Sequence, residues 1–310
     1  MDITAPRFTN EDNAREHLEA IRWPEGPFCP HCGSFDAKRL PAQRGKPSKR
    51  NPEGSVRVGV IQCNDCRKQF SVTVGTLFED SKVPLHKWLL ANHLLCASKK
   101  GMSAKQIERM LGVTYKTAWF MMHRIREAMK QDTGPMGGPG KVVEVDETFV
   151  GGKAINRAWA KIPVKHAVFS LVERNGNVAS YHIANVTVKT LKPLLLSKVH
   201  RASTLMTDEA SFYTGMGRQF ADHQRVNHRR SEYAKGPWHT NTVENFFSIF
   251  KRGIIGVYHH VSEAHLSRYT AEFDFRYNTR GGNDFERSEQ ALRGIYGKRL
   301  TYRRPDAIAA

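Results

Sequence analysis

Apolar residues recur at helical spacing in two stretches of the N-terminal half. Ala14, Leu18 and Ile21 lie on one face of an amphipathic segment within residues 1–27. Residues 85–98 are apolar at most positions and end just before a glycine. The first pattern predicts a surface helix with one buried face, and the second predicts a helix of the core.

Two further helices are expected directly after this core helix. Ser103 is placed to cap a helix over 104–111, Gly112 ends it, and Thr114 is placed to cap a longer helix over 115–130. Two helices joined by a tight turn that contains glycine are typical of a helix-turn-helix. The second helix carries basic residues for contacts with DNA phosphates: Lys116, Arg124 and Arg126.

The period changes from helical to strand-like in the C-terminal half. Residues 131–140 are rich in Gly and Pro and predict a linker at a domain boundary. Strands are expected over 141–152, 164–173 and 178–186, and the Asn-Gly pair between the last two predicts a hairpin. A helix, a strand, a helix, a strand and two helices should follow, in segments that include 191–200, 203–208, 225–230, 240–254 and 263–280. The expected fold class is mixed α/β.

The charge of the chain narrows the choice of partner. Forty-eight Lys and Arg against 30 Asp and Glu give a net charge of +18 and a pI near 9.8. A field of this sign attracts polyanions, and nucleic acid is the commonest of these in a cytoplasm. No stretch approaches 18 consecutive apolar residues, and the acidic, polar N-terminus is unlike a signal peptide. We therefore expect a cytoplasmic nucleic-acid-binding protein that does not enter a membrane.

Four of the five cysteines form two pairs with metal-ligand spacing. Cys29 and Cys32 make one C-x2-C pair, and Cys63 and Cys66 make a second, with 30 residues between the pairs. Each pair places two thiolates on a tight turn that can hold one side of a tetrahedral zinc ion. Four thiolates leave no open coordination position, so the predicted Zn²⁺ is structural. The basic insert between the pairs is punctuated by Pro, Gly and Ser over residues 41–54, which predicts a mobile loop.

Three acidic residues of this basic chain lie on separate predicted elements. Asp146 lies in the first strand of the C-terminal half, Asp208 ends a later strand, and Glu244 lies in the helix after the last strand. Carboxylates that converge from separate elements can hold two divalent ions about 4 Å apart, which is the arrangement for in-line attack on a phosphodiester. The pattern therefore predicts a catalytic site that binds Mg²⁺ or Mn²⁺.

Other charged residues near these three acids in the sequence are expected to assist them. Lys251 follows Glu244 by two helical turns, so both project from one helix face, where the lysine can bind the DNA phosphate beside the cut. Glu147 and Glu209 adjoin the two aspartates. Because neighbours on a strand face opposite ways, we expect these two glutamates to be supporting or structural.

Three blocks of the chain resemble the catalytic blocks of DDE transposases from bacterial insertion sequences. They are VEVDETFVGGK, LMTDEASFY and HTNTVENFFSIFKRGIIGVYHHVSEAHLSRYTAEFDFRYNTR. The chain most resembles the type with an N-terminal zinc ribbon, insertion-sequence group fifteen-ninety-five, over nearly its whole length. This resemblance implies an RNase H-like catalytic domain, preceded by a zinc ribbon and a helix-turn-helix. The order of strands and helices expected above is also that of the RNase H-like fold.

The resemblance also implies roles for individual residues. Asp146, Asp208 and Glu244 would form the metal-binding triad, and Lys251 would be the lysine that follows the glutamate in the family pattern. Some relatives use asparagine as the third member, which makes Asn241 the alternative to Glu244. We favour Glu244 because its spacing to both Asp208 and Lys251 fits.

The implied protein is a DNA transposase that binds terminal inverted repeats and performs metal-dependent strand cleavage and strand transfer. It would act on double-stranded DNA as a homo-oligomer. The expected domain limits are 1–78 for the ribbon with its N-terminal helix, 79–130 for the helix-turn-helix, 131–140 for the linker, 141–300 for the RNase H-like domain and 301–310 for a tail. The alternatives are an RNase H-like nuclease without strand transfer and a non-catalytic DNA-binding regulator that uses the ribbon and helix-turn-helix alone.

Overall fold

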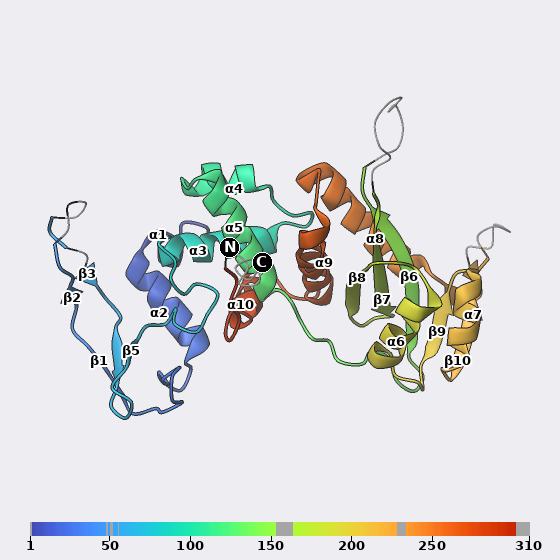
Figure 1. Ribbon diagram of the computed structural model, residues 1–310, viewed down its shortest axis with the longest axis horizontal. Helices are drawn as coiled ribbons and strands as arrows, with labels where there is room; N and C mark the ends of the chain where they lie inside the picture. Colours follow the sequence, from blue (N-terminus) through green and yellow to red (C-terminus); the bar gives the residue numbers. More distant parts are fainter. Residues whose placement is uncertain are drawn as a thin grey trace, which may run out of the picture. The chain divides into compact units, whose positions relative to one another are not determined.

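The computed structural model describes residues 2–47, 49, 52–54, 56–152, 164–227 and 234–301, and Figure 1 shows the succession of their elements. The chain divides into two compact units, which are described one at a time. The first unit comprises Met1–Ala97, Ala104–Ala128 and Asp284–Ala310, and the second comprises Ser98–Ser103 and Met129–Asn283. Within the described ranges, no helix has both the length and the apolar character needed to cross a membrane.

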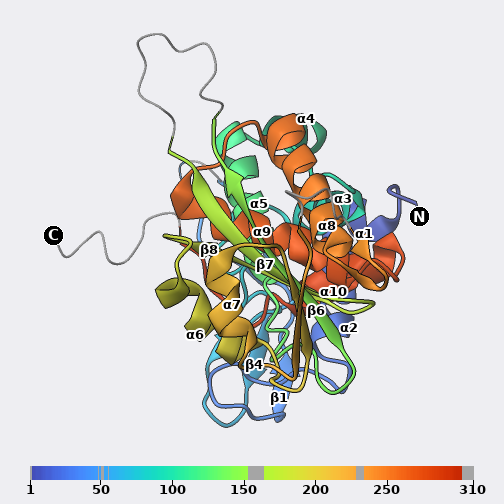
Figure 2. The same ribbon diagram turned by 90° about the vertical axis from the view of Figure 1, so that its right-hand side faces the viewer.

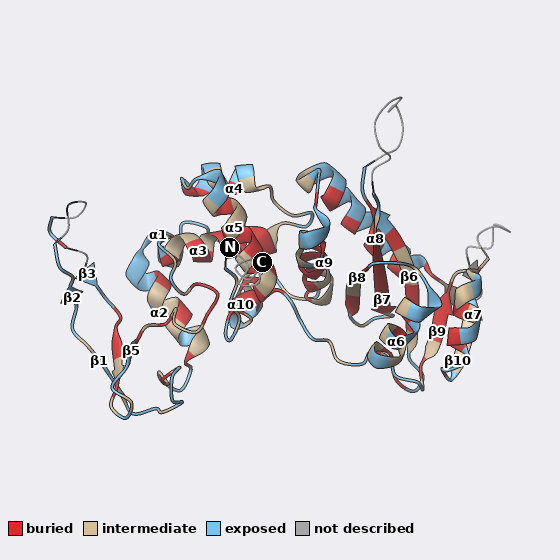
Figure 3. Cartoon of the chain, viewed as in Figure 1, coloured by how far each residue is buried: buried red, intermediate tan, exposed pale blue. Residues whose placement is uncertain are grey.

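A small antiparallel sheet forms the ribbon of the first unit. Its strands are β1 (Ala37–Arg39), β4 (Ile61–Cys63) and β5 (Gln69–Phe70), in the order β1-β4-β5. Two further short strands, β2 (Gln43–Arg44) and β3 (Val56–Arg57), pair antiparallel within the basic insert. The prediction of a mobile loop over 41–54 is therefore wrong for residues 43 and 44, which form a strand paired with β3. Figure 3 shows that this ladder is mostly exposed.

Helices make up the rest of the first unit: α1 (Pro6–Thr9), α2 (Glu11–Arg22), α3 (Leu85–Ala97), α4 (Ala104–Leu111), α5 (Tyr115–Ala128) and α10 (Asp284–Arg293). α2 begins after Asn10, whose side chain accepts hydrogen bonds from the backbone N–H groups of Asp12 and Asn13. α10 packs on α3, and the buried amide of Asn92 donates to the backbone oxygen of Ser288 at 2.9 Å. The sequence analysis had grouped α10 with the C-terminal half.

α4 and α5 form the predicted pair of helices. Gly112 has a φ of +61° between them, and the Thr114 hydroxyl accepts from the backbone N–H of Thr117 at 3.3 Å. However, Arg126 is only 1% exposed, and Arg124 donates to two backbone oxygens of the same unit. Arg126 is therefore part of the packing, so the expectation that it contacts DNA phosphates is wrong, whereas Arg124 is only partly buried and its contact with DNA stays a prediction.

The second unit is built on a five-stranded sheet with the order β10-β9-β6-β7-β8. Its strands are β6 (Val142–Val150), β7 (His166–Glu173), β8 (Val178–Ile183), β9 (Thr204–Thr207) and β10 (Asp222–Arg225). β7 runs antiparallel to β6 and β8, whereas β9 is parallel to both β6 and β10. The chain turns from β7 to β8 through Asn175, at a φ of +58°, as the Asn-Gly pair predicts. Together with the helices, this is an RNase H-like arrangement.

Helices cover both faces of this sheet, as Figure 2 shows. α6 (Val188–Lys198) and α7 (Ser211–Gly217) bury one face, with Val143 and Val145 of β6 in that core. α8 (Asn241–Gly253), a π-helical turn (Ile254–Tyr258) and α9 (Glu263–Asn278) bury the other face, which includes Val150. A two-stranded ladder of β11 (Ala234–Lys235) and β12 (Trp238–His239) precedes α8. The odd and even residues of β6 therefore face opposite helical layers.

Two local predictions in this unit need correction. The expected linker over 131–140 is packed against the sheet domain, because Met136 is 3% exposed and pairs with Val199. A Cβ on Gly137 would lie 2.1 Å from the Ser203 hydroxyl, so this close approach requires glycine. The strand expected over 225–230 lies earlier, in β10. Residues 228–230, like residues 302–310 of the expected tail, lie outside the described residues.

Candidate active site and zinc centre

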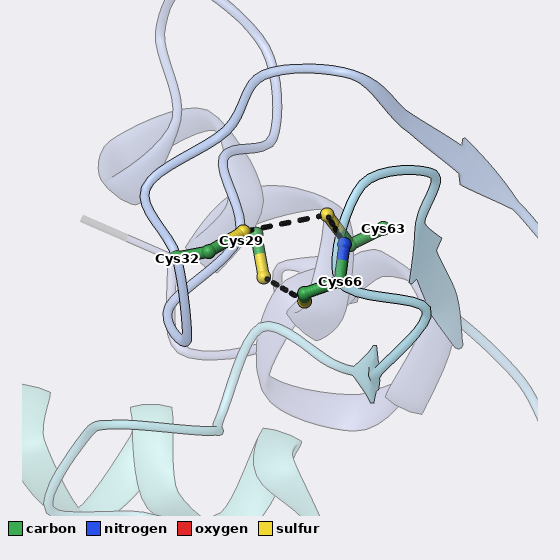
Figure 4. A group of neighbouring side chains, drawn as sticks. All are labelled: Cys29, Cys32, Cys63 and Cys66. Atoms are coloured by element: carbon green, nitrogen blue, oxygen red, sulfur yellow. Dashed lines mark hydrogen bonds between the residues drawn. The ribbon is translucent and has the colours of Figure 1, made fainter.

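The four paired cysteines converge on one point in the ribbon. Figure 4 shows the two pairs facing each other, with Sγ–Sγ distances of 3.6 Å for Cys29–Cys66 and 3.5 Å for Cys32–Cys63. All four Sγ atoms lie within 4.8 Å of one another. A tetrahedral zinc ion with Zn–S bonds of about 2.3 Å would separate its sulfurs by about 3.8 Å. The cluster therefore fits Zn²⁺ after small movements, and the centre is a structural zinc site.

Local backbone geometry prepares the sulfurs for a cation. The backbone N–H of His31 donates to Cys29 Sγ at 3.4 Å, and that of Cys66 donates to Cys63 Sγ at 3.5 Å. The bond from Cys66 lowers the pKa of the Cys63 thiol to about 7, because it stabilises the thiolate. Trp23 packs edge-on against Phe70 behind the cluster, with ring centroids 5.9 Å apart. The knuckles are thus held by the hydrophobic side of the ribbon.

Two of the three predicted carboxylates line one groove of the second unit. Asp146 and Glu244 line an open groove of about 490 Å³, which also contains Ser248 and Lys251. Asp208 follows β9, the parallel neighbour of β6, and its charge acts directly on Asp146. Among the described residues, these three carboxylates do not form a group with all ligand oxygens within 4.8 Å of one another. Asp208 lies near enough for its charge to act on Asp146, but it is not among the residues that line the groove.

Burial and repulsion between like charges raise the pKa of carboxyl groups in this groove. Desolvation raises the pKa of Asp146 to about 7, and the charges of Glu147, Asp208 and Glu244 add to the increase. The backbone N–H of Glu147 donates to Asp146 Oδ1 at 2.7 Å and opposes the shift. A carboxylate in this setting is costly to ionise until a cation approaches, so the donor set fits a hard divalent metal.

Glu147 also lines the groove beside Asp146, although strand alternation predicts that it faces the other way. Its carboxylate accepts a 2.7 Å hydrogen bond from the hydroxyl of Tyr213, a buried residue of α7. Burial raises the pKa of Glu147, and the charge of Asp208 raises it further. Glu147 therefore adds to the negative charge of the groove while its carboxylate also contacts α7, and its supporting or structural role stays a prediction.

Glu144 anchors the helix that carries Glu244, a feature that the sequence analysis missed. It is fully buried and accepts hydrogen bonds from the backbone N–H groups of Thr242 and Val243 at 2.8 and 3.0 Å. These N–H groups belong to the first turn of α8, whose unpaired donors favour a carboxylate. Arg174 pairs with Glu144 at 2.6 Å. The anchor lies two residues before Asp146, on the same face of β6.

Alternation along VEVDE could have revealed this anchor. Glu144 and Asp146 must share a face, and a charged residue on a buried face needs a partner. Arg174 could not have been found this way, because it reaches Glu144 only through the β6–β7 pairing, where Val143 lies opposite Glu173.

The two candidates for the third acidic position differ in location. Glu244 lines the groove and accepts a 2.8 Å hydrogen bond from the Thr240 hydroxyl. Asn241 is the exposed first residue of α8 and is not among the groove residues. Lys251 lines the groove two turns after Glu244. Glu244 therefore shares the groove with Asp146, whereas Asn241 and Asp208 are not among its lining residues, and the choice of Glu244 stays a prediction.

Two known protein families match separate parts of the chain. Residues 9–69 match the family described as the transposase zinc-ribbon domain, and residues 137–278 match the ISXO2-like transposase domain. The first range contains all four clustered cysteines, and the second contains the acidic triad and Lys251.

Two known proteins are similar to this chain at 27–28% identity. The chain is 28% identical over 293 residues to an "Uncharacterized protein in transposable element ISH50" of Halobacterium salinarum, covering 87% of this chain and 91% of that protein. It is 27% identical over 182 residues to male abnormal protein mab-31 of Caenorhabditis elegans, covering 52% of this chain but only 42% of that protein. The two matched domains, their order and the relative from a transposable element identify the chain as a member of the insertion-sequence transposases of group fifteen-ninety-five.

Proposed function

We propose that this transposase cuts the ends of its element and joins them to target DNA at the acidic groove. Asp146, Asp208 and Glu244 would hold two Mg²⁺ or Mn²⁺ ions there. When bound, such ions activate the attacking water or hydroxyl and stabilise the leaving oxygen of a phosphodiester. The proposal is supported by the groove that Asp146 and Glu244 share and by the pKa of Asp146, which burial raises to about 7 with a contribution from the charge of Asp208.

The chain's own residues would orient the DNA around this point. Lys251 lies on the groove face of α8, where its ammonium can bind the phosphate beside the scissile bond. Arg252 also lines the groove and can bind the next phosphate. Glu144 and Arg174 would act as positioning residues, because they hold the first turn of α8 and thereby the carboxylate of Glu244.

We further propose that the first unit recognises the terminal inverted repeats. The zinc ribbon within 1–78 and the helix pair within 79–130 would supply the contacts, and the β2–β3 ladder would present its arginines to phosphates. A net charge of +18 supports strong, salt-sensitive DNA binding. Because two ends must meet in one reaction, we expect the protein to act as a homo-oligomer in the cytoplasm.

Strand transfer in vitro tests the proposal. Labelled DNA ends from the sequence that flanks the gene would be incubated with the protein, a target plasmid and Mg²⁺ or Mn²⁺. We expect joined product from the wild type, and a loss of about 1,000-fold or more in Asp208→Ala with DNA binding retained. Cleavage of the ends with no joined product would favour the nuclease alternative, provided that a pre-cut end supplied in place of the intact one is not joined either. Binding without cleavage in either metal would favour the regulator.

Two single variants test the third carboxylate. Glu244→Gln keeps the shape of the side chain and removes its charge, so we expect activity to be lost. Asn241→Ala changes an exposed residue outside the groove lining, so activity should stay within about threefold of wild type. Full activity of Glu244→Gln together with loss in Asn241→Ala would transfer the role to Asn241.

A further inference from the structure

A second group of potential metal ligands lies on the outer part of the sheet. His166 begins β7, His182 lies near the end of β8, and Glu263 begins α9. One ligand atom of each lies within 4.8 Å of the other two. In the described part of the chain, this group and the cysteine cluster are the sets of three or more such residues that meet this distance limit. None of these three residues lines the acidic groove.

Sheet register and helix spacing explain why the three residues converge. Val168 lies opposite His182 in the β7–β8 pairing, so His166 is the diagonal neighbour of His182 on the same face. That face is covered by α9, whose Asp274 accepts hydrogen bonds from the backbone N–H and hydroxyl of Ser180 in β8. Glu263 precedes Asp274 by three helical turns, so it lies on the same side of α9. The convergence is therefore built by three rigid elements.

The distances fit a shared cation better than direct hydrogen bonds. Glu263 Oε2 lies 3.8 Å from His166 Nδ1, and Glu263 Oε1 lies 3.8 Å from His182 Nε2. These separations exceed the usual limit of about 3.2 Å for a hydrogen bond. Neither imidazole makes a hydrogen bond within the described residues, although each side chain is only about one-fifth exposed, at 19% and 21%. Each carboxylate oxygen thus faces one unbonded ring nitrogen.

We propose that His166, His182 and Glu263 bind a first-row divalent transition metal, with Zn²⁺ as the best fit. A tetrahedral ion with bonds of about 2.1 Å to nitrogen and oxygen would hold its ligand atoms about 3.4 Å apart. The two 3.8 Å separations involve different carboxylate oxygens, and one ligand atom of each residue lies within 4.8 Å of the other two, so the ligands need to approach by about 0.4–1.4 Å. Glu263 is 61% exposed and can make this movement. Two imidazoles favour Zn²⁺, Ni²⁺ or Co²⁺ over Mg²⁺, which separates this site chemically from the all-carboxylate groove.

The bound ion would fasten the start of α9 to β7 and β8. α9 covers the face of the sheet that also packs against α8, the helix of Glu244. Three protein ligands leave at least one position for water, so the site would be weaker and more exchangeable than the four-thiolate centre. Binding to the folded state alone raises stability in proportion to the logarithm of metal concentration. The site therefore adds a metal-dependent cross-link to this unit.

Cobalt titration of the full-length protein tests this site without relying on activity. The ribbon would be loaded with Zn²⁺, and excess Mg²⁺ would occupy the carboxylate groove. Co²⁺ would then be followed by its visible d–d absorption. We expect one further equivalent with nitrogen and oxygen ligation in the wild type. Glu263→Gln and His182→Ala should each weaken it more than about tenfold, since losing even an outer-shell partner has that effect.

Matched variants make the result decisive. His86→Ala removes a histidine that also pairs with a glutamate, at 2.9 Å from Glu11, and should leave the Co²⁺ titration unchanged. Glu263→Gln changes an exposed side chain, so a lost signal there cannot be attributed to misfolding. Equal Co²⁺ affinity in wild type, Glu263→Gln and His182→Ala would overturn the proposal. A signal that disappears in Asp208→Asn but survives in Glu263→Gln would also overturn it, by assigning the ion to the groove.

Discussion

The cysteine cluster and the acidic groove are assembled in opposite ways. The cysteines lie on two knuckles whose sulfurs are within 3.5–3.6 Å across the cluster, and backbone N–H groups already point at two of them. The carboxylates of Asp146, Asp208 and Glu244 come from two parallel strands and a distant helix. Local chain geometry prepares the first site, whereas the second exists only once the sheet and its helices have packed.

The two sites also differ in how ligand charge affects stability. A structural zinc ion contributes its binding free energy to folding, so the ribbon needs its ligands. In the groove, burial and like charges raise the pKa of Asp146 to about 7, so the ionised ligand destabilises the metal-free fold. Removing a ligand should therefore destabilise the first site and stabilise the second. Four experiments follow, from the largest expected effect to the smallest. Two change a ligand of one site, and two change buried charged residues elsewhere in the second unit.

Cys63→Ser should have the largest effect. It removes one of four ligands from a site type whose zinc binding is worth about 10–16 kcal/mol in small zinc-finger domains. We expect loss of the ribbon zinc, measured as metal content, and loss of protection from hydrogen exchange in β4 and β5. Cys96→Ser is the control, because Cys96 is buried in α3 outside the cluster and should keep the zinc. Unchanged zinc content in Cys63→Ser would remove the thiolate site from the comparison.

Asp146→Asn should separate activity from stability. We expect strand transfer to fall about 1,000-fold or more, while the free energy of unfolding at pH 8 without metal rises by about 1–4 kcal/mol. The pKa of this carboxyl is raised on folding, so its ionisation above pH 7 opposes the folded state. Asp132→Asn, at an exposed site where a backbone N–H lowers the pKa, should not stabilise the protein. Reduced stability of Asp146→Asn would contradict the electrostatic account of the groove.

Arg174→Ala should damage the groove indirectly. The substitution leaves the buried carboxylate of Glu144 without its cation and removes two hydrogen bonds from Arg174 to the backbone before α8. Breaking a buried ion pair in this way costs about 3–5 kcal/mol. Urea unfolding measures the loss, and Arg201→Ala, an exposed arginine bonded to Gln219, should change stability by less than about 0.5 kcal/mol. If both variants unfold alike, Glu144 and Arg174 do not anchor α8.

Asp274→Asn should change the pH dependence of stability. Burial raises the pKa of Asp274 to about 7 from an ordinary value of 3.8. Between these two values the folded state binds a proton that the unfolded state has lost, so stability falls as pH rises from about 4 to 7. The shift corresponds to at most about 4 kcal/mol. Urea unfolding at pH 5 and pH 8, in an Asp146→Asn background, should show a smaller difference for Asp274→Asn. An unchanged difference would argue against a neutral Asp274.

The sequence predicts features that depend on local patterns better than features that depend on distant packing. The C-x2-C pairs and the strand over 141–152 are local patterns, so the zinc centre and the position of Asp146 were predictable. The burial of Arg126 and the anchor at Glu144 depend on partners far away along the chain. His166, His182 and Glu263 likewise carry no shared motif, because their proximity depends on strand register and on the packing of α9.

The packing of α10 on α3 has a consequence for how the protein is made. The hydrogen bond between Asn92 and Ser288 joins residues 196 positions apart, so the first unit lacks part of its core until α10 has been synthesised. Domains fold as their chains emerge from the ribosome. The sheet domain, complete by residue 283, is therefore available to fold first. A chain that stops before residue 284 would contain the sheet domain but lack α10, which packs on α3 in the core of the first unit.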